Sequence, residues 1–117
     1  KKVIYECQKQ GVGLLLGSDA PQVFSVPGFS LKHELTYLVE AGLTPYEALR
    51  TGTYNVGQFF KNDNLGVIKK GAVADLVLLN ANPMKDISAV GEVEGVMLNG
   101  KWLSKEEIKN TLKKLEK

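Results

Sequence analysis

The stretch GLLLGSDA, residues 13–20, places a carboxylate directly after an apolar run. Residues 12–16 contain no polar side chain, a pattern typical of a strand that is buried on both faces of a parallel sheet. Gly17 and Ser18 end the run, and Asp19 follows. In parallel β/α arrays, functional residues gather at the carboxyl ends of the strands. Asp19 is therefore the first candidate functional residue.

Helix signals lie on both sides of this predicted strand. Residues 1–10 place apolar side chains at helical spacing, and Gly11 stands where a helix C-cap glycine is common. Residues 20–29 contain two prolines and a glycine and predict a loop. Ser30 is a candidate N-cap for the next helix, which we expect to end at Gly42.

Two shorter helices are predicted next. Thr44 can cap a helix, Pro45 suits its first position, and Glu47 completes a capping box. This helix should reach about Thr51. Asn55 is a candidate cap for a further short helix that ends near residue 60.

The sequence becomes strand-like after residue 61. Residues 66–83 predict two strands around Lys70 and Gly71, and Asn99-Gly100 predicts a type I′ turn. That turn would pair Met97 with Trp102. The final helix should start at a second capping box, Ser104-x-x-Glu107, and should carry an apolar face formed by Ile108, Leu112 and Leu115.

Composition gives no sign of a nucleic-acid or membrane partner. The net charge is only +2, and no apolar run approaches the roughly 18 residues of a membrane span. With Cys7 as its single cysteine, the chain forms no internal disulfide. We expect a soluble protein, with the cytoplasm as the favoured compartment. The chain begins Lys1-Lys2, without methionine, so we expect a piece of a longer gene product.

A strand buried on both faces needs neighbouring strands to satisfy its backbone groups. The later strand signals in this chain resemble antiparallel hairpins, so we expect the neighbours of residues 12–16 to lie upstream of residue 1. A helix followed by a buried strand and another helix is one unit of a parallel β/α array.

Three blocks carry a family resemblance: GVGLLLGSDA, HELTYLVEAGLTPYEALRTGTYNVGQFF and GVIKKGAVADLVLLNANPMKDI. They resemble the C-terminal part of amidohydrolase-superfamily metal-dependent hydrolases of the imidazolonepropionase-like and prolidase-like branch. The resemblance implies an α/β fold: the last βα unit of a (β/α)8 barrel, followed by helices and the C-terminal part of a small β-sandwich. The expected segments are the end of the barrel domain (1–62), the sandwich portion (63–103) and a C-terminal helix (104–117).

The same resemblance implies hydrolysis of amide or peptide C–N bonds through a metal-activated water. Asp19 matches the strand-eight aspartate, which is both a metal ligand and the proton shuttle. The implied cofactor in the intact parent is a divalent metal, most simply one or two zinc ions. The family's histidine pairs and bridging carboxylated lysine would lie upstream, so we expect this chain alone to be metal-free and inactive.

The loop that follows the strand end is the expected substrate side of the site. Gln22, Val23 and Phe24 are predicted to line a pocket for a small-molecule amide or peptide substrate. The other expected partners are the remainder of the parent enzyme and further copies in a homo-oligomer.

Simpler interpretations stay open at this point. Asp19 could be a loop or cap carboxylate, and His33 a surface or packing residue. Ser18 lacks the Gly-x-Ser-x-Gly elbow of a hydrolase nucleophile and is expected to be structural. The whole chain could instead be a non-catalytic α+β module for assembly or binding. A His-x-His strand in the upstream coding sequence would separate that alternative from the hydrolase.

Overall fold

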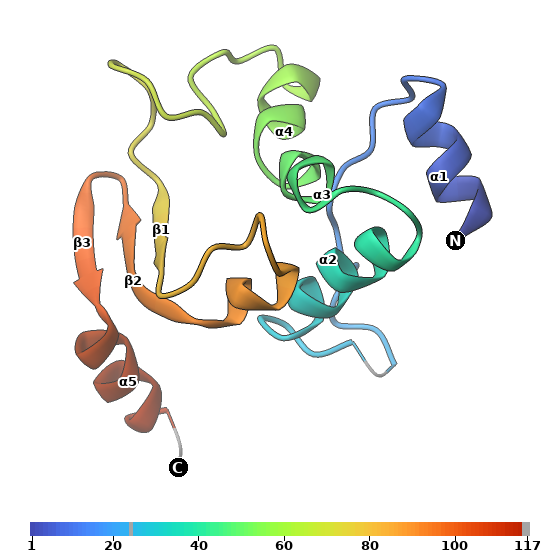
Figure 1. Cartoon of the computed structure of the whole chain (residues 1–117). Helices are drawn as coiled ribbons and strands as arrows, with labels where there is room; N and C mark the ends of the chain where they lie inside the picture. Colours follow the sequence, from blue (N-terminus) through green and yellow to red (C-terminus); the bar gives the residue numbers. More distant parts are fainter. Residues whose placement is uncertain (24, 116–117) are drawn as a thin grey trace.

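The chain divides into a helical half and a sheet half (Figure 1). The computed structural model describes residues 1–23 and 25–115. The helical half contains α1 (Lys2–Lys9), α2 (Ser30–Glu40), α3 (Pro45–Thr51) and α4 (Tyr54–Phe59). The sheet half contains β1 (Leu76–Leu79), the 3-10 turn η1 (Ile87–Gly91), β2 (Val93–Leu98), β3 (Lys101–Ser104) and α5 (Lys105–Lys113).

Local signals set the ends of the helices. The capping box of α3 is confirmed, because the Thr44 side chain accepts from the Glu47 N–H and the Glu47 carboxylate accepts from the Thr44 N–H at 2.7 Å. Gly11 and Gly42 take the left-handed φ angles of +73° and +111° that let the chain leave α1 and α2. Ser30, predicted as a cap, is instead the first residue of α2, and its hydroxyl donates to the Val26 carbonyl at 3.0 Å.

The prediction for Asn55 is wrong. Thr53 occupies the N-cap position of α4, and Asn55 lies inside the helix. Its side-chain amide donates to the carbonyl of Leu14 at 3.0 Å, a residue far away in the sequence. The amide thus serves a long-range contact and is not available to cap the helix.

The sheet is antiparallel, with strand order β1-β2-β3. The predicted β2–β3 hairpin is confirmed: Asn99 and Gly100 have φ angles of +49° and +77°, and Met97 pairs with Trp102. Only the second of the two strands predicted within 66–83 forms. Within the described ranges, no strand lies beside residues 66–69, so this run has no ladder partner.

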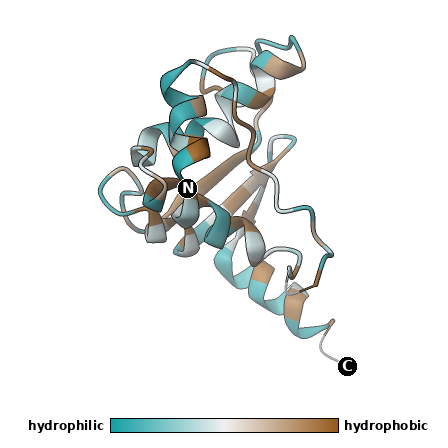
Figure 2. Cartoon of the chain, turned by 90° about the vertical axis from the view of Figure 1, so that its right-hand side faces the viewer, coloured by the Kyte–Doolittle hydropathy of each residue, from teal (hydrophilic) through white to brown (hydrophobic). Residues whose placement is uncertain are grey.

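Helix α5 packs against the hairpin only along its first turns. The capping box of Ser104 and Glu107 is confirmed, and Ile108 is half-buried. Leu112 and Leu115, predicted on the same apolar face, are exposed because α5 extends beyond the sheet, as Figure 2 shows.

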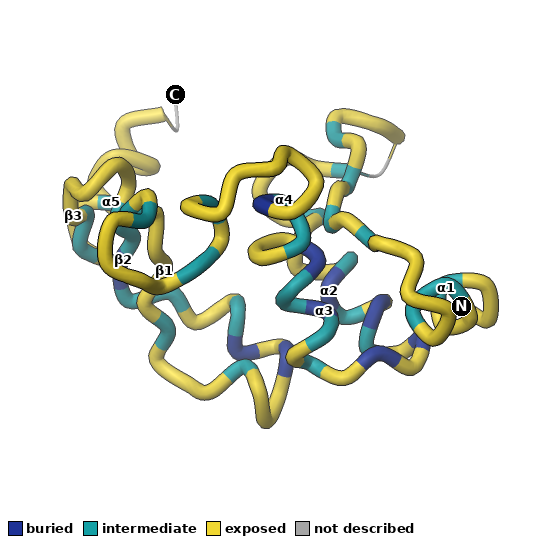
Figure 3. The backbone as a smooth tube through the Cα atoms, turned by 90° about the horizontal axis from the view of Figure 1, so that it is seen from above, coloured by how far each residue is buried: buried dark blue, intermediate teal, exposed yellow. Residues whose placement is uncertain are grey.

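The main core lies where the two halves meet. Its buried side chains come from α2, the connection from α2 to α3, α3 itself and η1, namely Leu35, Leu38, Leu43, Ala48 and Ile87. Figure 3 shows these buried stretches around α2 and α3, while most of the remaining backbone is exposed. The turn η1 therefore fastens the sheet half onto the helical half. Among the described residues, no helix combines the length and the apolar character needed to span a bilayer.

Residues 12–20, called the site segment below, differ from the predicted buried strand. They join no strand ladder within the described residues. Leu14 and Leu16 pack against the core, whereas Val12 and Leu15 are 51% and 43% exposed. The segment is thus covered on one face only. The reason is physical: a ladder needs a second strand, and the described chain places none at this position.

Candidate active site at the end of residues 12–20

The carboxylate of Asp19 is exposed at the end of the site segment. Its backbone takes a φ of +50°, in the left-handed region that Asp tolerates better than most residues. Its Oδ2 accepts a hydrogen bond from Gln22 Nε2 at 3.1 Å. Asp19 is therefore accessible to a ligand and is oriented by a neighbour in the following loop.

The loop folds back against the end of the segment. The Ser25 N–H donates to the Gln22 carbonyl at 2.9 Å, and the Ser25 hydroxyl donates to the Ser18 carbonyl at 3.2 Å. The Gly17 N–H is 3.4 Å from a Glu34 carboxylate oxygen of α2. The loop and α2 therefore contact the backbone of the two residues directly before Asp19.

The three residues predicted to line a substrate pocket have different outcomes. Gln22 lies against Asp19 through its side-chain amide. Val23 is 83% exposed at the turn of the loop. Phe24 lies outside the described residues. The structure thus brings one of the three into contact with the candidate carboxylate.

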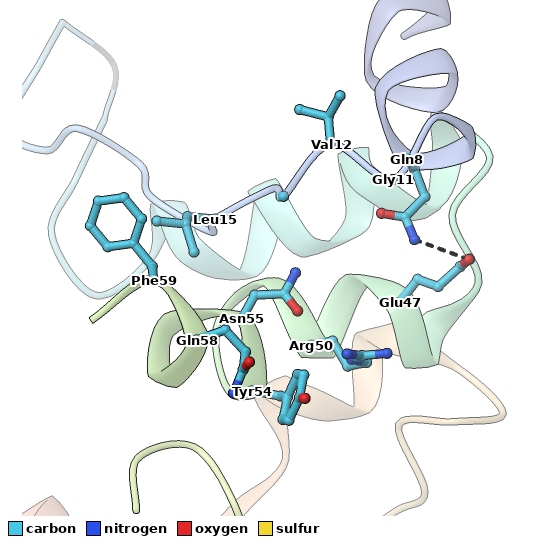
Figure 4. A pocket seen from close by; sticks show the side chains of 11 residues that line it. Gln8, Gly11, Val12, Leu15, Glu47, Arg50, Tyr54, Asn55, Gln58 and Phe59 are labelled. Carbon is cyan, nitrogen blue, oxygen red and sulfur yellow. Dashed lines mark hydrogen bonds between the residues drawn. The ribbon is translucent and has the colours of Figure 1, made fainter. Parts of the chain in front are cut away.

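Helices α3 and α4 support the other end of the site segment. Asn55 of α4 donates to the Leu14 carbonyl, and the Leu16 N–H donates to the Thr51 carbonyl at 3.1 Å. Figure 4 shows Asn55 projecting from α4 toward the part of the segment that carries Leu15. Sequence reasoning missed this role of Asn55, because an asparagine in the first turn of a helix also fits a cap.

One hollow near the start of the site segment does not have Asp19 in its wall. It has a volume of about 540 Å³ and lies between α1, the start of the site segment, α3 and α4 (Figure 4). Gln8 donates to Glu47 across it at 3.2 Å, and the guanidinium of Arg50 lies 4.4 Å from the centre of the Tyr54 ring. Its carboxylate, Glu47, is already engaged in the capping box of α3. The Glu47 carboxylate in this hollow is therefore occupied by structural hydrogen bonds.

A smaller hollow of about 390 Å³ lies beside the site loop, between α2 and the start of α1. Ser18, Ser25 and His33 contribute to its wall. His33 is exposed, in agreement with its predicted surface role. It makes no hydrogen bond to Asp19 within the part of the chain that the structure describes.

The described residues do not form a complete metal centre by themselves. No three His, Cys, Asp or Glu side chains in residues 1–23 and 25–115 come together as a metal-binding group. A carboxylate oxygen such as that of exposed Asp19 is a suitable ligand for a divalent cation, but a zinc site needs three or four protein ligands. Asp19 fits such a site as one of several ligands.

Comparisons with known proteins agree on one family. The sequence profile of the Amidohydrolase family matches residues 3–103. The chain is 34% identical over 93 residues to ochratoxinase from Aspergillus niger. Its fold is similar to the crystal structure of that enzyme, with a TM-score of 0.75, 30% identity and 88% of this chain covered. A Xaa-Pro dipeptidase with bound methionine in its active site matches with a TM-score of 0.75, 27% identity and 87% of this chain covered.

All three matches concern larger proteins. The chain spans 18% of the curated ochratoxinase, 24% of the ochratoxinase structure and 25% of the dipeptidase structure. The small antiparallel sheet and the helices packed beside it recur within these longer folds. With a profile match over residues 3–103, the chain belongs to the amidohydrolase family.

Proposed function

We propose that this chain is the C-terminal part of a metal-dependent amidohydrolase that cleaves amide or peptide C–N bonds in small molecules, and that Asp19 is its metal ligand and proton-transferring carboxylate. Residues 1–62 then form the end of a (β/α)8 barrel, 63–103 part of a β-sandwich, and the segment from 104 onward contains the terminal helix α5. Family membership favours this enzyme over the non-catalytic α+β module.

One observation carries the proposal: Asp19 is an exposed carboxylate on the uncovered side of the site segment. Burial alternates along the segment: Leu14 and Leu16 pack on the core, whereas Leu15, Gly17 and Asp19 are exposed. In a barrel, the side opposite the helices is the interior. The alternation therefore directs Asp19 toward the interior at the carboxyl end of the strand, where barrel enzymes hold their active sites.

The chemistry assigned to Asp19 follows from its hydrogen bonding. A divalent metal, zinc in this proposal, supplies a water whose pKa is lowered toward neutrality. Gln22 Nε2 donates to Oδ2 of Asp19, which leaves further lone pairs on the carboxylate that would hold the metal and accept the proton of the attacking water. The carboxylate would later deliver that proton to the leaving nitrogen. Gln22 orients the carboxylate, and contact of Val23 and Phe24 with the substrate stays a prediction.

The full-length protein that contains this chain tests the reaction class. We expect it to hydrolyse Xaa-Pro dipeptides or N-acyl amino acids, to lose turnover after dialysis against a strong chelator, and to regain it when Zn²⁺ is returned. Unchanged turnover in a preparation shown to be metal-free would contradict the metal-dependent mechanism. If the metal-loaded protein hydrolysed neither Xaa-Pro dipeptides nor N-acyl amino acids, the proposed reaction class would be contradicted.

A further inference from the structure

We infer that Asn55 is a positioning residue, which fixes the site segment so that Asp19 is held at the reacting atoms. This inference rests on the proposed function of Asp19. Asn55 is in the first turn of α4, and its bond to the Leu14 carbonyl joins residues on different elements. The bond lies several residues before Asp19, so Asn55 acts through the backbone and touches neither substrate nor metal.

Two main-chain groups on one edge of the site segment are bonded by the α3–α4 region. In an extended chain, the N–H and C=O groups of residues i and i+2 point to the same edge. The Leu14 C=O accepts from Asn55 Nδ2 at 3.0 Å, and the Leu16 N–H donates to the Thr51 C=O at 3.1 Å. A helix end and one amide therefore hold this edge of the site segment at Leu14 and Leu16.

The groups that make these bonds are themselves well anchored. Thr51 is fully buried, and its hydroxyl donates to the Ala48 carbonyl at 2.7 Å. A Cβ atom on Gly52 would lie 2.9 Å from Leu16 Cδ2, so this glycine lets the helix end approach the segment closely. The contact between the end of α3 and the site segment is therefore part of the packing of α3.

The consequence for Asp19 is a fixed register. A shift of one residue along an extended chain moves every side chain to the opposite face. The bond from Asn55 to Leu14 and the bond from Leu16 to Thr51 resist such a one-residue shift, and in the register that they hold Leu14 and Leu16 face the core and Asp19 is exposed. Loosening this edge would leave Asp19 in place on average but less well oriented.

The test uses the full-length enzyme with Asn55→Asp, which keeps the size of the side chain and removes the amide donor. We expect kcat to fall by roughly 10- to 100-fold, the usual cost of losing a group that orients a metal ligand, with KM changed less than about 2-fold. Zn²⁺ affinity, measured by chelator competition, should fall in the same range. Asn110→Asp, the same change on the exposed face of α5, should leave both quantities unchanged.

A double-mutant cycle separates positioning of Asp19 from a general loss of stability. If Asn55 acts through Asp19, Asn55→Asp should cost less than about 2-fold in kcat when Asp19 is already Asn. An equal loss in both backgrounds would overturn the inference. If Asp19→Asn alone keeps wild-type kcat, the proposed function fails instead, so the two failures are distinguishable.

Hydrogen exchange supplies a readout that does not depend on turnover. In Asn55→Asp the Leu16 amide should exchange faster, while amides of α5 exchange at the wild-type rate. Asn55→Gln, with the same amide one methylene further out, serves as the second variant if Asn55→Asp does not fold, and it should show the same pattern. Unchanged Leu16 exchange together with unchanged kcat in a folded variant would overturn the inference.

Discussion

Gly66 lies where both the backbone angle and the surrounding space exclude a side chain. Its φ is +66°, and a Cβ atom there would lie 2.2 Å from the carbonyl oxygen of Thr53. Gly71 in the same loop has a φ of +86° but meets nothing within 4 Å. Alanine substitutions at Gly66 and Gly71 therefore separate the free-energy cost of the positive φ from the free-energy cost of the close contact.

We predict that Gly66→Ala destabilises the protein more than Gly71→Ala. Gly71→Ala should cost about 1–2 kcal/mol, because alanine is strained at a positive φ. Gly66→Ala should cost about 1–3 kcal/mol more, because the backbone of Thr53 must move. Thermal unfolding of the two variants measures the difference, and equal melting temperatures would contradict the close approach.

At the scale of the element, the capping box of α3 carries a charge that responds to pH. Hydrogen bonds from the Thr44 backbone N–H, from the Thr44 hydroxyl and from the Gln8 amide, with the Arg50 charge nearby, hold the pKa of Glu47 below its ordinary value. A lowered carboxyl pKa stabilises the fold above the unfolded pKa of about 4.3. That contribution is lost as the pH falls through the lower, folded pKa.

Glu47→Gln should therefore destabilise the protein at pH 7 and lose this effect in acid. We expect the melting temperature of the wild type to approach that of the variant between about pH 4.3 and the lower folded pKa. Melting curves at a series of pH values check this. A difference that stays constant down to pH 2, or that widens, would show that the Glu47 charge does not stabilise the box.

Elements whose determinants lie within a few residues were predictable. The box at Thr44, the box at Ser104 and the turn at Asn99-Gly100 each depend on neighbours at most three positions away, and each was found as predicted. A glycine or a capping side chain fixes such backbone locally, whatever the remainder of the fold does.

Elements that depend on distant partners were not predictable. Asn55 fits a helix cap by sequence, but its partner Leu14 is 41 residues away, and no local pattern reports that contact. The apolar run 12–16 marked the correct segment, yet its pairing depends on strands that the described chain does not contain. The candidacy of Asp19 came from its place after that run and from the family resemblance, and its bond to Gln22 became visible only in the structure.

At the scale of the whole molecule, large apolar side chains remain exposed along free edges. β1 is an edge strand of the sheet, and Val77 and Leu78, on its opposite faces, are 57% and 55% exposed. The site segment leaves Leu15 open in the same way. In the proposed parent enzyme, the upstream part of the chain covers these edges.

Residues 1–117 expressed alone should therefore self-associate, because exposed apolar edges pair with other chains. Sedimentation velocity should show species larger than the monomer, and Val77→Lys should reduce their share by placing a charge on the edge of β1. A monodisperse monomer with slow amide exchange across residues 12–16 would contradict the claim that another part of the parent enzyme covers these edges.

The central claim is that Asp19 moves the proton in amide hydrolysis, and the kcat of Asp19→Asn in the full-length enzyme tests it most directly. The change keeps the size of the side chain but removes its charge and its proton acceptor. We predict a folded enzyme whose kcat is about 10²- to 10⁴-fold lower. Asp75→Asn is the control: Asp75 accepts from the Asn99 N–H at 2.6 Å, an amide oxygen can still accept that bond, and turnover should stay near wild type. A folded, zinc-loaded Asp19→Asn enzyme with wild-type kcat would contradict the claim.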